Sequence, residues 1–294
     1  MAVGPKWDID EPRAWLSRAV LVVLLSGVAA WASPAAAGAA DTSLPIDEPG
    51  TLADAQRLFY NAHYAEAAAL ALALQRDDGD ALPRLELRSS ALLFQIRALL
   101  EGRRRNKEEA LKACATCPGL IAEFLDDIRR GQALARASLR ADPTSEHALF
   151  YLGKLDLNYV WLQLGPLGKK TGWDEYWEAR RSLDAVLKRN PEHVRAKVSR
   201  AWIDYIVDTR MPWGTRWLLG GGNRKQALID VRRAAEMESD FFTHAEAEFA
   251  LWDMLVRERE LAPAKDAAQR LAHAFPDNRE VATFLESSET PPRR

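Results

Sequence analysis

The sequence predicts an all-α fold, and three observations lead to that prediction. Apolar side chains recur at the three- and four-residue spacing of a helix almost throughout the chain beyond residue 50. The alternation of apolar and polar residues that is typical of a strand is lacking. Turn signals arrive at regular intervals, so we expect helices of ordinary length joined by turns.

The composition excludes several classes of protein. The 294 residues carry 40 Lys and Arg against 42 Asp and Glu, a formal net charge of −2, so no overall field gathers nucleic acid or anionic lipid. Charged residues make up 28% of the chain, which argues against a multi-span membrane protein. We therefore expect a chain of globular type with no nucleic-acid partner.

Residues 1–40 have the pattern of an export signal that precedes the fold. Three basic residues come first, and the apolar run at 19–32 has 14 residues, fewer than the roughly 20 that span a bilayer. Small residues follow, and we expect cleavage near Ala40. The expected location is therefore periplasmic or secreted. An N-terminal anchor that is not cleaved is the alternative, and it would be the only link to a membrane.

The helical pattern occupies residues 51–287, between a short linker at 41–50 and a disordered tail at 288–294. Segments that show the helical spacing clearly are 52–61, 65–75, 85–100, 121–141 and 194–208. Turn signals that contain Pro, Asp or Asn lie at 141–145, 189–193 and 275–278. Each of them ends one helix and offers a capping residue or Pro to the next.

The two cysteines of the chain form a C-x-x-C pair, Cys114 and Cys117. Haem attachment needs a His after the second Cys, where this chain has Pro118. A thioredoxin-like redox site needs a βαβ context, and a zinc site needs two more soft ligands. We expect a local disulfide, or a pair of unreactive thiols, at the end of a helix.

A repeat is visible in the second helix of each predicted helical hairpin. A small residue is followed by Pro 12 positions later, in the pairs Gly131 and Pro143, Ala179 and Pro191, and Ala264 and Pro276. The segments that contain Ala67 and Ala227 fit the same frame with Gly79 and Ser239. Adjacent helices approach closely at the small residue and stop at the Pro.

With this pattern the chain resembles the tetratricopeptide-repeat (TPR) family over roughly residues 51–287. Gly153 lies where the family has a small residue in its first helix, but the usual Trp and Tyr positions are not consistently filled. The resemblance implies a right-handed superhelical solenoid of helical hairpins whose concave face usually binds a protein or peptide. The resemblance does not imply catalysis. Within the family, the chain resembles exported bacterial TPR proteins without an assigned activity.

Two stretches depart from the repeat, at 157–173 and 208–223. Each lies between the two helices of a hairpin, where the family needs only a few residues, so we expect two long loop insertions on one edge. Six of the ten tryptophans fall between residues 157 and 223, the span that holds both stretches, together with several Arg and Lys side chains. Aromatic rings with cations are typical of recognition surfaces. The alternative is that these tryptophans fold back and fill the core.

The expected function is a non-catalytic scaffold that binds a protein or peptide through the concave face and the loops around 158–222. The expected contact residues are Trp173, Trp177, Lys170, Trp213, Arg216, Trp217, Tyr205 and Arg210. A periplasmic small-ligand receptor, or a transporter-associated TPR component with an aromatic pocket, is the alternative. The Gly-rich stretch 220–222 precedes Asn223, which we expect to cap a helix rather than to form a phosphate loop.

Catalytic constellations are mostly missing. The five histidines show no metal-ligand spacing, and no nucleophile motif is present, so we expect neither enzyme activity nor a metal or other cofactor. Asp204, Asp208 and Glu178 are where a general acid and base would lie if an enzyme site exists. Pairing of these carboxylates with arginine would count against that possibility.

Overall fold

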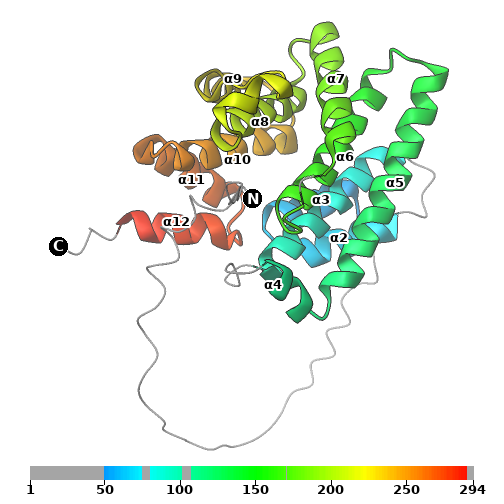
Figure 1. Cartoon of the computed structure of the whole chain (residues 1–294). Helices are drawn as coiled ribbons and strands as arrows, with labels where there is room; N and C mark the ends of the chain where they lie inside the picture. Colours follow the sequence, from blue (N-terminus) through cyan, green and yellow to red (C-terminus); the bar gives the residue numbers. More distant parts are fainter. Residues whose placement is uncertain (1–49, 75–79, 101–106, 170, 290–294) are drawn as a thin grey trace, which may run out of the picture.

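The computed structural model describes residues 50–74, 80–100, 107–169 and 171–289, and these residues contain helices but no strand (Figure 1). The all-α prediction is confirmed for this part of the chain. The α-helices are α1 (Leu52–Tyr60), α2 (Tyr64–Ala73), α3 (Ala81–Leu100), α4 (Lys107–Ala113), α5 (Cys117–Ala141), α6 (Glu146–Leu164), α7 (Trp173–Arg189), α8 (Val194–Arg210), α9 (Arg224–Glu236), α10 (Phe241–Arg257), α11 (Leu261–Ala274) and α12 (Arg279–Glu289). A 3₁₀ helix, η3 (Trp213–Leu219), lies between α8 and α9.

Two predicted boundaries fall at or beyond the edges of the described residues. The expected leader at 1–40 and nearly all of the linker at 41–50 lie outside them. The predicted tail at 288–294 begins too early, because α12 continues to Glu289.

Side-chain caps set several helix starts. Thr51 and Asp54 form a capping box at α1, in which each side chain accepts a hydrogen bond from the other residue's backbone N–H. Ser145 caps α6, and the Asn223 side chain accepts a hydrogen bond from the backbone N–H of Gln226 at 3.1 Å. The prediction that Asn223 caps a helix is therefore confirmed.

Helices that follow one another pack side by side, and small residues permit the close approach. A Cβ atom on Gly131 of α5 would lie 2.6 Å from Leu155 Cδ1 of α6. A Cβ atom on Gly153 of α6 would lie 3.0 Å from Leu183 Cγ of α7. The small residues that define the sequence repeat are thus the points where helices meet.

Two large hydrophobic cores and one small cluster, Ala55, Ala71 and Leu87, hold the described helices together. The first large core involves α2, α3 and α5 to α8, and its fully buried side chains include Phe124, Leu155 and Leu183. The second involves α8 to α12 and includes Met254 and Phe275. In Figure 1 the yellow-to-red helices α8–α12 accordingly lie to one side of the blue-to-green helices α2–α7. Helix α8 contributes to both cores and joins them.

The first helix lies against the last part of the described chain. The Tyr60 ring of α1 stacks on Phe249 of α10, with 5.4 Å between ring centroids. The Asn278 side chain, just before α12, donates a hydrogen bond to the Tyr60 backbone oxygen at 2.8 Å. These contacts connect segments about 200 residues apart and add α1 to the second core.

An ion-pair network ties four helices together. Arg195 of α8 bonds Glu86 of α3 at 3.0 Å and Glu246 of α10 at 2.6 Å. Lys154 of α6 bonds the same Glu246 at 2.6 Å. Burial alone would raise the pKa of Glu246, but Arg195 and Lys154 outweigh it and lower that pKa to about 2. We call these four side chains the central network.

The structure corrects the predicted loop insertion at 157–173. Helix α6 continues to Leu164, so only residues 165–172 connect it to α7. The reason is that the apolar side chains of Leu157, Val160 and Leu162 are buried and keep the helical spacing. The second predicted insertion also contains structure, because η3 occupies most of it.

Cys114 and Cys117 form a disulfide at the start of α5. Cys117 is fully buried, and Pro118 occupies the first turn of the helix, where Pro is well tolerated. The pair therefore has the local structural position that the sequence predicts.

Candidate functional site

The segment η3 presents a cluster of exposed apolar side chains. Trp213 is 85% exposed, Trp217 is 73% exposed and Leu218 is 53% exposed. Pro212 comes directly before the segment, and Gly220 and Gly221 follow it with positive φ angles of 79° and 73°. Such φ angles favour glycine, so the Gly-rich stretch turns the chain back into α9. We call Trp213, Trp217 and Leu218 the apolar tip.

The base of this segment is firmly held. The Tyr176 hydroxyl donates a hydrogen bond to the Leu219 backbone oxygen at 2.8 Å. Arg180 donates to the same oxygen at 3.1 Å and to the Gly220 oxygen at 3.0 Å. A Cβ atom on Gly222 would lie 2.5 Å from the Asp204 backbone oxygen, so the chain also packs closely on α8. The tip is therefore an exposed group on a fixed support.

Arg216 contributes to that support. Its guanidinium forms an ion pair with Asp208 and donates to the Met211 backbone oxygen at 3.1 Å. The second carboxylate oxygen of Asp208 accepts a hydrogen bond from the Arg224 backbone N–H at 3.0 Å. Asp208 thus connects the segment to the start of α9, and Arg216 has a positioning role that the sequence did not predict.

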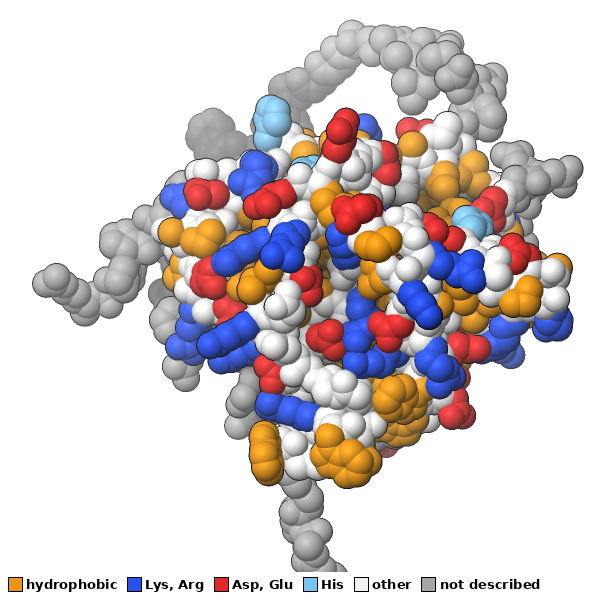
Figure 2. All heavy atoms as spheres, turned by 90° about the horizontal axis from the view of Figure 1, so that it is seen from above, with side chains coloured by type: hydrophobic (Ala, Val, Ile, Leu, Met, Phe, Trp, Pro, Cys, Tyr) orange, Lys and Arg blue, Asp and Glu red, His pale blue; other side chains and the backbone are white. Residues whose placement is uncertain are grey.

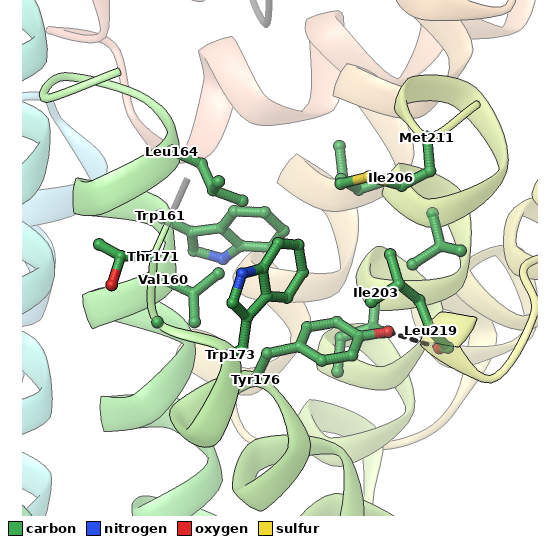
Figure 3. Close-up of a pocket in the computed structure, with 12 residues that line it drawn as sticks. Val160, Trp161, Leu164, Thr171, Trp173, Tyr176, Ile203, Ile206, Met211 and Leu219 are labelled. Carbon is green, nitrogen blue, oxygen red and sulfur yellow. Dashed lines mark hydrogen bonds between the residues drawn. The ribbon is translucent and has the colours of Figure 1, made fainter. Parts of the chain in front are cut away.

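An apolar crevice lies beside the segment, between α6, α7 and α8 (Figure 3). Figure 3 shows Trp161 and Trp173 next to each other, with Ile206 and Met211 across the crevice. Trp173 is 43% exposed and covers part of this space. The cavity is about 20 Å³, which is room for about one water molecule.

A second, open groove of about 570 Å³ lies along α7. Its lining residues are Asp174, Trp177, Glu178 and Arg181. Arg136 of α5 forms an ion pair with Glu178 at this groove. The lining therefore mixes one aromatic ring with charges of both signs.

The structure places the predicted contact residues in different environments. Trp173, Trp213 and Trp217 are exposed, and Trp177 is half-buried against the first core. Arg216 and Arg210 are half-buried, and Lys170 lies outside the described residues. Trp173 and η3 approach one another, because Trp173 and Leu219 line the same crevice.

Tyr205 is a correction to the predicted contact set. It is only 2% exposed, and its hydroxyl donates a hydrogen bond to Glu258 at 2.8 Å. Burial and this bond raise the pKa of Tyr205. The helical spacing of α8 turns its side chain into the second core, so Tyr205 stabilises the fold rather than contacting a partner.

Sequence reasoning missed Leu218 and Arg180. The apolar residues 217–219 come directly before three glycines, which indicate a tight turn. Because a tight turn cannot bury all of its neighbouring side chains, this pattern could have indicated that Leu218 is exposed. Nothing local in the sequence pairs Arg180 with backbone oxygens 39 and 40 positions away.

The carboxylates considered for catalysis are paired with arginines. Asp204 lies 2.6 Å from Arg200 and 3.6 Å from Arg180, Asp208 pairs with Arg216, and Glu178 pairs with Arg136. Within the described ranges, no group of three or more His, Cys, Asp and Glu side chains is arranged to hold a metal ion.

Figure 2 shows acidic and basic side chains interspersed over one face of the molecule, without a large area of one sign. None of the helices that the structure describes combines the length and apolar character needed to cross a bilayer.

A comparison with protein-family models finds no match, and comparisons with curated proteins and with solved structures find none either.

Proposed function

We propose that this protein is an exported, non-catalytic TPR-type binding module that recognises a protein or peptide through the apolar tip. The solenoid part of this proposal is supported by consecutive helices that pack side by side and by small residues at their contacts. The observation that carries the binding function is the 85% and 73% exposure of two tryptophans on a firmly held segment.

An exposed tryptophan leaves a large apolar area in contact with water, and covering that area favours binding of a partner. Each indole buries a large apolar area when a partner covers it, and a rigid support limits the conformational entropy that binding removes. The Trp217 indole N–H already donates to the Gly214 backbone oxygen at 3.0 Å. A partner therefore meets mainly the apolar ring of Trp217, and apolar side chains of the partner are the best match.

Helices α3, α6, α8 and α10 meet at the central network. Here their side chains bond one another and are largely buried. We therefore assign the contact to the edge formed by η3 and Trp173.

The small-ligand alternative has two observations in its favour, the apolar crevice that Trp173 partly covers and the open groove along α7. Pockets for small molecules usually measure several hundred Å³ and have mostly apolar walls. The crevice of about 20 Å³ is far smaller, so a ligand would need Trp173 to move first. The groove of about 570 Å³ has the right size, but it is open and three of its four lining residues are charged. We therefore favour a macromolecular partner.

Site-specific photo-crosslinking in cells tests the proposal. A photoreactive amino acid replaces Leu218, and in a matched control it replaces Leu261 on α11, which is 58% exposed. We expect a defined protein adduct from position 218 and none of the same mass from position 261. Circular dichroism of both variants checks that the helical content is unchanged.

Three outcomes would contradict the proposal. The same adduct from both positions would show that the crosslinking is not specific to the tip. Adducts with lipid alone, supported by co-sedimentation of the pure protein with anionic vesicles, would make the tip a membrane contact. No adduct from position 218, combined with a small molecule whose binding quenches tryptophan fluorescence, would favour the ligand receptor.

A further inference from the structure

Asp156 of α6 is a fully buried carboxyl group with incomplete hydrogen bonding. Its Oδ1 atom accepts a hydrogen bond from the Gln132 amide of α5 at 2.7 Å. Its Oδ2 atom has no hydrogen-bond donor among the described residues. An ionised carboxylate in this position would leave a buried negative oxygen without a partner, which is strongly unfavourable.

A second carboxylate lies close enough to Asp156 to interact with it. Glu178 of α7 acts on Asp156 directly, and Arg136 of α5 acts on both. Helix α3 also packs on α6, but its buried charges bond elsewhere. Its Arg88 pairs with Asp127, and its Glu86 belongs to the central network.

A proton on Asp156 would give its Oδ2 atom a hydrogen-bond partner. A protonated Oδ2 can donate a hydrogen bond to an oxygen of the Glu178 side chain, which also forms an ion pair with Arg136. Burial and the adjacent Glu178 carboxylate together raise the pKa of Asp156 from its ordinary 3.8 to about 8. Asp156 is accordingly protonated at neutral pH and loses its proton in mildly alkaline solution.

We propose that Asp156 holds a proton beside Glu178 and forms a pH-sensitive switch where α5, α6 and α7 meet. Loss of the proton places two negative charges side by side in a largely buried position. Their repulsion acts between α6 and α7 and moves Glu178, which lines the open groove together with Trp177. The switch is independent of the proposed partner-binding function, because it requires only these three helices.

The direction of the pH effect follows from proton linkage. Between about pH 4 and pH 8 the folded protein holds a proton on Asp156 that the unfolded chain has released. The contribution of this group to stability is fully present below pH 4, decreases as the pH rises, and is exhausted above about pH 8. An Asn at position 156 keeps the acceptor for Gln132 and supplies a permanent donor toward Glu178.

The test compares denaturant unfolding of the wild type and the Asp156→Asn variant between pH 5 and pH 8. We expect the ratio of their unfolding constants, wild type over variant, to rise about 500-fold over this range. The Asp174→Asn variant, which removes an exposed carboxylate at the same groove, should keep the wild-type pH dependence. A wild-type to Asp156→Asn ratio that does not change with pH would overturn the proposal.

Infrared spectroscopy of the wild type gives an answer even if the variant fails to fold. A difference spectrum between pH 6 and pH 9 should show the loss of one protonated carboxylic acid, because ordinary Asp and Glu side chains are already ionised at pH 6. The absence of such a band would show that Asp156 is ionised throughout and would overturn the proposal. The pH response of Trp177 fluorescence reports whether the groove moves with it.

Discussion

Individual residues at the η3 edge divide into those that face solvent and those that hold the segment. Trp213 and Trp217 bury little of their surface, so they add little to the stability of the isolated protein. Arg180, Arg216 and Tyr176 bond the backbone around them and fix their position. Binding and stability should therefore separate when these two groups of residues are mutated.

The double variant Trp213→Ala, Trp217→Ala should unfold within about 0.5 kcal/mol of the wild type, since surface substitutions away from packed features have small effects. Tyr205→Phe should cost about 1 kcal/mol, because it removes the hydrogen bond to Glu258. Urea unfolding followed by circular dichroism measures both. A larger loss from the double variant would mean that the tip is part of the core.

Two glycines of α5 differ in how closely other atoms approach them. Gly131 faces Leu155 of α6 with no room for a side chain, whereas a Cβ atom on Gly119 would have nothing within 4 Å. The repeat in the sequence predicted the close approach at Gly131. It could not predict the extension of α6 to Leu164, because a TPR-like frame expects a shorter helix there.

A matched pair of substitutions tests this packing. Gly131→Val should destabilise the protein by about 1–3 kcal/mol, because the added atoms force α5 and α6 apart. Gly119→Val on the same helix should change stability by less than about 1 kcal/mol. Thermal and urea unfolding provide the comparison. Equal effects of the two substitutions would show that the helices do not approach closely at Gly131.

Across the whole molecule, the features that the sequence could not predict depend on contacts between residues that lie far apart in the chain. Local spacing was sufficient for the helices, for Asn223 as a cap and for the position of the Cys114–Cys117 disulfide. The stacking of Tyr60 on Phe249 and the partners of Asp156 depend on residues that only the folded chain brings together. Trp161, Trp177 and Trp202 are partly buried against the two large cores, whereas Trp173, Trp213 and Trp217 are exposed.

The pH dependence of stability is a prediction for the whole molecule. Glu246 holds its proton only near pH 2 when folded but near 4.5 when unfolded, so its contribution is lost as the pH falls below about 4.5. Asp156 contributes less as the pH rises toward 8. Burial lowers the pKa of His193, which offsets part of the Asp156 effect below about pH 6.5.

We therefore expect the free energy of unfolding to decrease below about pH 4.5 and again between about pH 6.5 and pH 8. Urea unfolding at a series of pH values, at constant ionic strength, measures this profile. Stability that rises steadily from pH 6.5 to pH 8 would contradict the protonation state assigned to Asp156, and stability that does not fall below pH 4.5 would contradict the state assigned to Glu246.

Binding of a protein or peptide by the apolar tip is measured by an equilibrium titration with the purified partner that the crosslink identifies. We expect the double variant Trp213→Ala, Trp217→Ala to weaken binding at least about 30-fold, equivalent to a loss of about 2 kcal/mol at an interface hot spot. Leu261→Ala, a matched exposed position, should bind as the wild type does. Equal affinity of the wild type and the double tryptophan variant would show that the apolar tip is not the binding site.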